Sequence, residues 1–245
     1  MDSGYYAAST ALISRTQALD TIANNLANAS TVGYRAVHNV FSSVLATAGG
    51  TSDTPLNQAM NNYGILSGTT LDETQGALQK TGNELDLAIR GKAYFVVQTA
   101  NGPMYTRNGS FQVSGSGQLV TAAGDTVMSD HGTISLPPGP ISISSDGTIS
   151  SKGAVVGKVK LVQFPAGTKL TSAGETYYSA PPNTETTAED STVQQGMVES
   201  SNVNPVSSMV ELITAQRSAE MMQRALSMFN SEMDKTATQD LPKVG

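Results

Sequence analysis

The sequence predicts an α+β fold that is mainly β, in which an antiparallel β domain is flanked by long N- and C-terminal coiled-coil-like helices that pack together. Two observations predict this fold class. Both ends of the chain carry apolar residues that alternate at spacings of three and four, as in a coiled coil. The middle carries short apolar runs separated by turn signals about every 8 to 12 residues, which is typical of antiparallel hairpins.

The first helix is expected over residues 4–30. The residues of its seam are Tyr5, Ala8, Leu12, Arg15, Leu19, Ile22, Leu26 and Ala29. Arg15 is the one violation of the apolar pattern. The helix is expected to stop near Gly33, because the β-branched Thr31 and Val32 followed by a glycine make its continuation unfavourable.

The middle of the chain is expected to form hairpins. The predicted strand regions are 93–98, 104–128, 141–150 and 158–164. Asn108-Gly109 and Asp146-Gly147 supply turn residues of the kind that two-residue hairpin loops require, and the SGSG stretch at 114–117 supplies another turn. The β domain is therefore predicted between residues 81 and 200.

Two stretches carry few strand signals. Residues 36–80 are interpreted as an extended linker region with one short helix around 38–46, and residues 179–196 as a loop-rich connector. The predicted domains are 1–35 (N-terminal helix of an inner helical domain), 36–80 (extended linker region), 81–200 (antiparallel β domain) and 201–245 (C-terminal helix of the inner helical domain).

The second long helix is expected to begin at Pro205, with Asn204 as its N-cap, and to end before Pro242. Its seam consists of Leu212, Ala215, Ala219, Met222, Leu226, Phe229 and Met233. A neighbouring apolar stripe is formed by Val206, Val210 and Ile213. The early part of this helix is therefore expected to contact more than one partner.

The two seams predict an assembly. A narrow apolar stripe on a helix cannot bury itself alone, so we expect the two terminal helices to pack against each other and against the same helices of other copies. The sequence therefore favours a polymer.

Composition and charge exclude several classes of function. A net charge of −6 with a pI near 4.8 argues against nucleic acid and against anionic membrane surfaces as partners. The chain has no cysteine, so it has neither disulfides nor thiolate metal sites. No segment reads as a membrane-inserted helix, and the first residues do not resemble a cleaved signal peptide.

The residues that could carry chemistry are few. His38 and His131 are interpreted as ordinary surface histidines. Asp86, Asp125 and Asp146 lie in turn contexts, where a solvated charge is commoner than general acid catalysis. We therefore expect no enzyme, no cofactor, no metal and no small-molecule substrate. Two alternatives stay open: an exported module that binds sugar or peptidoglycan, and a cell-wall hydrolase that uses these carboxylates.

Four segments together resemble the signatures of bacterial flagellar axial proteins, the rod and hook subunits. They are residues 22–35, 81–98, 105–121 and 197–226. The first contains Ala23-Asn24-Asn25-Leu26-Ala27-Asn28 followed by Thr31, Gly33 and Tyr34. The segments occur in the family's order and span nearly the full chain, and the middle pair is similar to the basal-body rod subfamily.

The resemblance to the flagellar basal-body rod family implies a structural subunit that polymerises through its terminal helices into a hollow helical drive shaft, with the β domain outside. It implies export through the flagellar type III apparatus without a cleaved signal peptide, and a location in the periplasm-spanning rod of the basal body. The partners would be further copies and other rod subunits. Residues 139–164 and the short linker at 36–70 favour the proximal-rod subunit; the distal-rod subunit of the same family is the alternative.

The asparagines inside the first helix raise a separate question, because each costs about 0.5 kcal/mol relative to Ala in a helix interior. We hypothesise that their amides bond across subunit boundaries and fix the register; the alternative is that they only let the helix fray. The candidate assembly residues are Leu12, Leu19, Ile22, Asn24, Asn25, Leu26, Asn28, Gly33, Asn202, Asn204, Leu212, Gln216, Arg217, Met222, Leu226 and Phe229.

Overall fold

A computed structural model describes residues 2–42, 65–174, 176–188 and 190–235. The chain divides into two compact units. The first, here called the helical unit, comprises Met1–Leu26, Val37–Thr69 and Pro205–Gly245. The second, the β unit, comprises Ala27–Ala36 and Thr70–Asn204. The chain thus passes between the units four times.

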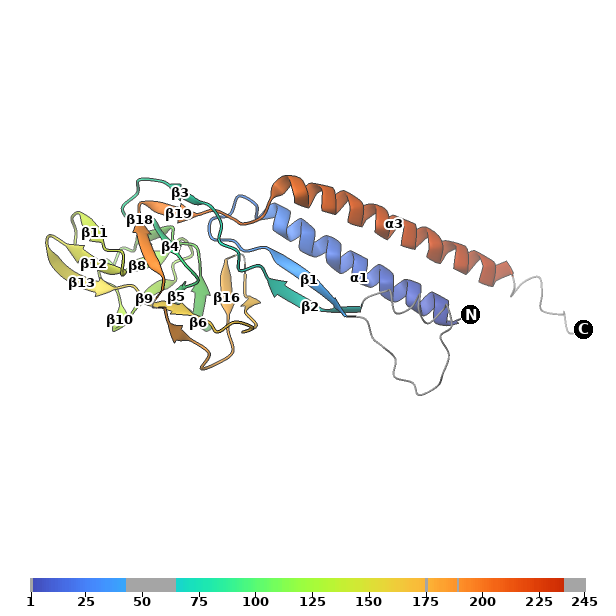
Figure 1. The fold of residues 1–245 in the computed structure, drawn as a ribbon, viewed down its shortest axis with the longest axis horizontal. Coiled ribbons are helices and arrows are strands. Elements are labelled where there is room, and N and C mark those ends of the chain that lie inside the picture. Colours follow the sequence, from blue (N-terminus) through green and yellow to red (C-terminus); the bar gives the residue numbers. More distant parts are fainter. Residues whose placement is uncertain (1, 43–64, 175, 189, 236–245) are drawn as a thin grey trace, which may run out of the picture. The chain divides into compact units, whose positions relative to one another are not determined.

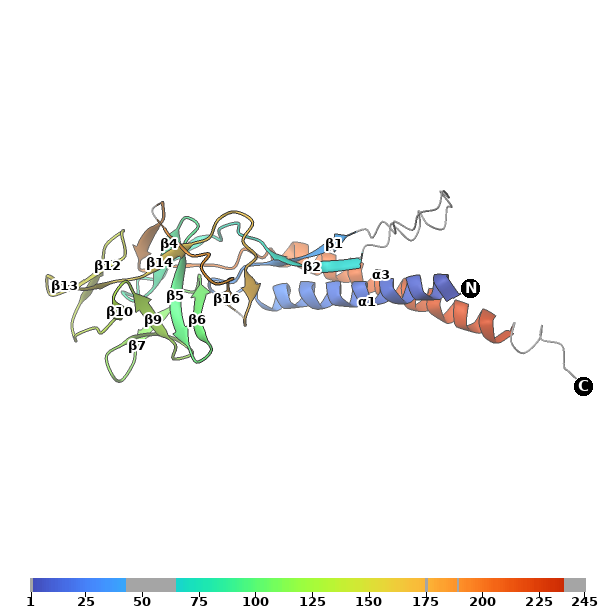
Figure 2. The same cartoon turned by 90° about the horizontal axis from the view of Figure 1, so that it is seen from below.

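The helical unit contains two helices and one small sheet among the described residues. Helix α1 spans Asp2–Ala27 and helix α3 spans Pro205–Lys235. Strands β1 (Val37–Ser42) and β2 (Ile65–Leu71) form a two-stranded sheet. Figures 1 and 2 show α1 and α3 side by side and antiparallel, with β1 and β2 alongside. A two-stranded sheet is marginal by itself, so it depends on this helical support.

The β unit holds the remaining described strands, and each pairing resolved between them is antiparallel. Their bounds are β3 Leu78–Lys80, β4 Leu87–Arg90, β5 Tyr94–Thr99, β6 Gly102–Thr106, β7 Phe111–Val113, β8 Leu119–Thr121, β9 Thr126–Ser129, β10 Gly132–Thr133, β11 Ile141–Ile143, β12 Thr148–Ser151, β13 Ala154–Lys158, β14 Leu161–Gln163, β15 Thr171–Ser172, β16 Tyr177–Ser179, β17 Thr186–Thr187, β18 Thr192–Gln195 and β19 Met197–Glu199. The largest sheet has the path β15-β16-β6-β5-β9-β8-β7, and Figure 2 shows its central strands β6, β5 and β9 side by side.

The core of the β unit lies on both faces of β5. On one face Phe95 and Val97 join a large apolar cluster, where the rings of Phe95 and Phe111 meet edge to face at 5.1 Å. On the other face Tyr94 and Val96 pack in a smaller cluster rich in tyrosine. Because alternate residues of a strand point to opposite faces, the continuous apolar run of β5 buries both of its sides.

Most of the predicted β elements are confirmed. The run predicted at 93–98 is β5, the SGSG stretch joins the paired strands β7 and β8, and Asp146-Gly147 joins the paired strands β11 and β12. Asn108-Gly109 follows β6, but it does not close a hairpin, because β6 pairs with β5 and β16 whereas β7 pairs with β8.

Two predictions for the connecting segments are wrong. The short helix expected around 38–46 is replaced by strand β1 over Val37–Ser42, while the rest of that range lies outside the described residues. The connector expected at 179–196 contains β17 and β18, and β18 forms a sheet with β4. In both cases the pairing partner is distant in sequence, so a local pattern could not reveal the strand.

The predicted fold class is wrong in its helical part. The described chain is mainly β with two helices, and these do not form a coiled-coil pair that flanks the β domain. A coiled coil fills its seam with large apolar side chains, but the face that α1 buries carries Ser14, Ala18 and Asn25. The aliphatic residues Leu12, Leu19, Ile22 and Leu26 of the predicted α1 seam lie on its flank and are only partly buried. The small residues on α1 allow β1 to pack against it. Strand β1 and an open groove therefore lie where a coiled coil would have its seam.

Residues 27–36, called the strap below, belong to the β unit although they directly follow the described body of α1. The backbone N–H of Gly33 donates to the carbonyl of Glu199 at 2.7 Å. At the end of the strap, the N–H of Ala36 donates to Oδ1 of Asn202, also at 2.7 Å. The strap is therefore held by polar contacts to the segment that precedes α3.

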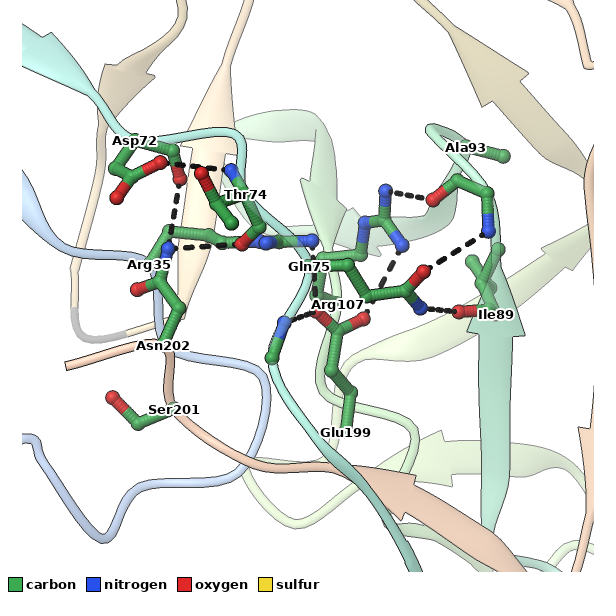
Figure 3. Close-up of polar contacts among 12 residues, drawn as sticks. Arg35, Asp72, Thr74, Gln75, Ile89, Ala93, Arg107, Glu199, Ser201 and Asn202 are labelled. Atoms are coloured by element: carbon green, nitrogen blue, oxygen red, sulfur yellow. Dashed lines mark hydrogen bonds and ion pairs between the residues drawn. The ribbon is translucent and has the colours of Figure 1, made fainter. Parts of the chain in front are cut away.

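A buried ion cluster completes this attachment. The carboxylate of Glu199 lies 2.7 Å from Nη2 of Arg35 in the strap and 3.2 Å from Nη1 of Arg107, and all three side chains are at most 2% exposed (Figure 3). Arg107 also donates to the carbonyl of Gly91 at 2.7 Å and lies over the ring of Tyr94 at 4.8 Å. Burial lowers the pKa of Arg107, and Glu199 opposes that shift. One carboxylate therefore compensates two buried cations.

Replacement of Glu199 should strongly destabilise the β unit. In Glu199→Gln both guanidinium groups stay buried without their counter-charge, so we expect the free energy of unfolding to fall by about 3 to 5 kcal/mol. Urea unfolding followed by near-ultraviolet circular dichroism of the buried tyrosines measures this. The control is Glu220→Gln, whose ion pair with Arg224 is 4.0 Å long and mostly exposed, and it should cost about 0.5 kcal/mol or less. Equal, small effects of both changes would contradict the interpretation.

Gly33 should be far less tolerant of a side chain than Gly82. Both have positive φ, +71° and +77°, so alanine costs about 1 to 2 kcal/mol of backbone strain at either position. A Cβ on Gly33 would also collide with the backbone of Asn108, whereas a Cβ on Gly82 would meet no atom within 4 Å. Urea unfolding of Gly33→Ala should therefore show a loss at least twice that of Gly82→Ala. Matching losses would show that the close packing of the strap contributes little.

Candidate assembly interface

An open groove of about 370 Å³ lies within the helical unit, between α1, β1 and α3. Ala18 and Ile22 of α1, Val37 of β1, and Val210 and Ala215 of α3 supply its apolar surface. Its polar residues are Arg15, Thr21, Asn25, His38, Asn39, Glu211, Thr214 and Ser218. An open groove with an apolar floor and two charged residues, Arg15 and Glu211, suits a protein side chain better than a buried cofactor.

Asn25 has a defined place in this unit. Its side-chain Nδ2 donates to the carbonyl of Val37 at 2.8 Å, and its Oδ1 accepts the N–H of Val37 at 2.9 Å. The side-chain amide thus forms hydrogen bonds with the backbone of β1 in the way that a neighbouring strand would. Two partly buried hydrogen bonds, each worth about 1 kcal/mol, offset the cost of an asparagine in the helix. This is a bond within the chain, so it explains Asn25 without a subunit boundary.

The other two asparagines differ from Asn25. Asn28 is 9% exposed and its Oδ1 accepts the hydroxyl of Thr31 at 3.1 Å, which stabilises the turn after α1. Asn24 is exposed. The hypothesis that these amides bond across subunit boundaries stays a prediction.

Helix α3 has two apolar faces. The predicted seam faces inward, where Ala219 is buried and Leu212, Met222 and Leu226 are half-buried. A second face is left exposed, and we call it the ridge; its residues are Val206, Met209, Val210, Ile213, Met221 and Met228, each between 51% and 72% exposed. An apolar stripe of this length on one helix indicates a surface that binds a protein partner.

The structure places the remaining candidate residues in different environments. Leu12, Leu19, Ile22 and Leu26 are half-buried on the flank of α1. Gly33 and Asn202 belong to the β unit, where Nδ2 of Asn202 donates to the carbonyls of Asp72 and Thr74 at 3.1 and 3.0 Å (Figure 3). Asn204, Gln216 and Arg217 are exposed, and the side chain of Phe229 lies outside the described residues. The predicted set therefore divides into structural residues and surface residues.

Sequence reasoning missed the most strongly buried charged residues. Arg35 directly follows the Gly33-Tyr34 pair of the first signature, and Glu199 is the third residue of the last one. Their positions inside signature segments were the only local signal, because a buried charge is expected only where its partner is known. The small residues Ser14 and Ser208, buried on the two helices, were also missed.

The carboxylates considered for catalysis take part in local structure. Asp86 accepts the hydroxyl of Thr81 at 2.6 Å, and Asp146 accepts that of Thr148 at 2.7 Å. Asp125 accepts the hydroxyl of Tyr177 at 2.8 Å. Over the described residues, no group of three potential metal ligands occurs. Neither described helix combines the length and the apolar character that a bilayer crossing requires.

Three family models match the chain, in an order that follows its architecture. A model described as flagella basal body rod protein matches residues 6–35, on α1 and the strap. The D1 domain model of flagellar hook protein FlgE/F/G matches residues 88–154 in the β unit. The C-terminal model of flagellar basal body rod FlgEFG protein matches residues 194–240, which include the described α3.

Full-length relatives agree with these models. The chain is 33% identical over 253 residues to the flagellar basal-body rod protein FlgF of Caulobacter vibrioides, with both chains covered completely. It is 34% identical to FlgF of Mesorhizobium japonicum over 96% of each chain. It is also 32% identical to the flagellar basal-body rod protein FlgG of Buchnera aphidicola, over 89% of this chain and 92% of that one. The chain therefore belongs to the family of flagellar basal-body rod proteins, which are structural proteins of the flagellar basal body.

Proposed function

We propose that this chain is a proximal-rod subunit that polymerises through its terminal helices into the hollow drive shaft of the flagellum. The observation that carries the proposal is the full-length similarity to FlgF relatives, from α1 through the β unit to α3. The distal-rod type is the alternative, since FlgG relatives match at 31–32% identity over 89–92% of this chain. The more complete coverage of the FlgF relatives favours the proximal rod.

The exposed ridge supports assembly through the helices. Its apolar side chains gain stability only when another surface removes them from water, at about 25 cal/mol per Å² of apolar area. The inward face of α3 is already partly occupied within the helical unit. We therefore propose that residues 1–35 and 201–245 supply the inner layer of the rod, with the β domain on the outside.

The partners and the export route are proposed because the chain belongs to the rod family. The proposed partners are further copies of this chain and other rod subunits of the proximal and distal rod. Export through the flagellar type III apparatus is proposed on the same ground, together with a position in the rod where it crosses the periplasm.

A structural rather than catalytic role is part of the proposal. The relatives are named as rod proteins, and Asp86, Asp125 and Asp146 bond to neighbouring hydroxyl groups that hold their local turns and strands. Carboxylates that serve as acceptors in this way are stabilising parts of the fold. The protein would thus act by transmitting torque through its contacts.

The location of the chain tests the function. In a strain that lacks the gene, an epitope-marked copy should restore swimming and label isolated basal bodies at the proximal end of the rod by immuno-electron microscopy. Label at the distal end would favour the FlgG-like alternative. Restored swimming with no label in the basal body would contradict a structural role in the rod.

Leu26→Asp should prevent incorporation. Leu26 is half-buried on α1, so a carboxylate there opposes packing with a neighbouring apolar surface, and swimming should fall to the level of the deletion strain. Ala23→Asp, at an exposed position of the same helix, is the matched control and should swim normally. Near-ultraviolet circular dichroism should show an intact β unit in both variants. Normal rods containing Leu26→Asp would contradict the role of α1 in assembly.

A further inference from the structure

The ridge and the groove lie on adjacent sides of α3. At about 100° per residue, Ile213 and Arg217 share one side of the helix, and Thr214 and Ser218 in the groove are turned from them by roughly 60° to 140°, whereas Met221 lies between the two sets, about 20° from Thr214. Val210 lies on the border between the two surfaces. Because α3 itself lines the groove, one copy cannot place its own ridge in its own groove, and each subunit presents both surfaces to its neighbours.

The charges on the two surfaces are complementary. Arg217 interrupts the apolar ridge and is exposed, and Glu211 is an exposed residue of the groove. Within the part of the chain that the structure describes, neither of them forms an ion pair, whereas Arg224 and Glu220 pair with each other at 4.0 Å. Glu211 and Arg217 are six positions apart, so they do not face each other on one helix. The other charged residue of the groove is Arg15, on α1.

We infer that the groove receives the ridge of a second copy of this chain, with Ile213 and Met221 against its apolar surface and Arg217 beside Glu211. This inference rests on the proposed function and adds the identity of the contact. Because the ridge differs from the groove, the contact is heterologous and leaves one free ridge and one free groove at the ends of each pair. Such a contact propagates into an open-ended assembly instead of a closed dimer.

Cysteine cross-linking tests the contact directly, since the chain has no cysteine of its own. The test variant carries Thr214→Cys in the groove and Met221→Cys on the ridge. The two positions are about 10 Å apart along the helix, which exceeds the separation of about 7 Å that a disulfide can bridge. Oxidation of intact basal bodies should therefore give a ladder of dimers and larger multimers on a non-reducing gel.

Three controls make the ladder specific. Thr214→Cys alone and Met221→Cys alone should stay monomeric, because the groove faces a ridge and not another groove. Thr214→Cys combined with Gln223→Cys, an exposed residue away from the ridge, should also stay monomeric. If the double variant is incorporated into basal bodies but gives no ladder, the inference is overturned and the proposed function stays intact. Dimers from either single variant would have the same consequence. Absence of the chain from basal bodies would overturn the proposed function and this inference with it.

Charge reversal tests the pairing of Glu211 with Arg217. In the Thr214→Cys, Met221→Cys background, Glu211→Arg or Arg217→Glu should each reduce the multimer yield several-fold by placing like charges together. The two reversals combined should restore the yield, because opposite charges again face each other. A combined variant that forms no more multimer than either single reversal would overturn the pairing.

Discussion

The β unit depends on one buried carboxylate. Glu199 compensates the guanidinium groups of Arg35 and Arg107, and all three side chains are almost fully removed from water. A buried cation without a partner costs several kcal/mol, so none of the three is independent of the others. Arg35 lies near the point where the chain leaves for β1, and Glu199 lies shortly before α3. The cluster thus holds the segments next to both terminal elements on the same body.

The strap makes the β unit depend on both ends of the sequence. Residues 27–36 are continuous with the N-terminal signature, yet their contacts include residues close to 200. The close packing of Gly33 beneath the backbone of Asn108 allows no side chain there. The β unit is therefore complete only when a short N-terminal segment and the end of the long central segment are both present. This is a non-local requirement that ties the two ends of the sequence together.

The helical unit is held together differently from the β unit. Small residues on α1 and the amide of Asn25 admit strand β1 where a coiled coil would place large side chains. Helix α3 turns its seam inward, and its second apolar stripe is then left facing water. A surface that a single chain cannot cover, next to a groove that it cannot fill, is what an assembling subunit of a rod requires.

The sequence by itself determined the two helices, the hairpin-rich middle and the family, because these are written in local periodicity, turn residues and signature segments. Ala219 is buried and Leu212 half-buried on the face of α3 that carries the predicted seam, although the coiled coil predicted there is wrong. Only the tertiary structure decided that Arg35 meets Glu199, that Asn25 bonds to β1 and that residues 37–42 form a strand. Each of these depends on a partner distant along the chain, and local patterns carry no information about which distant residues come into contact.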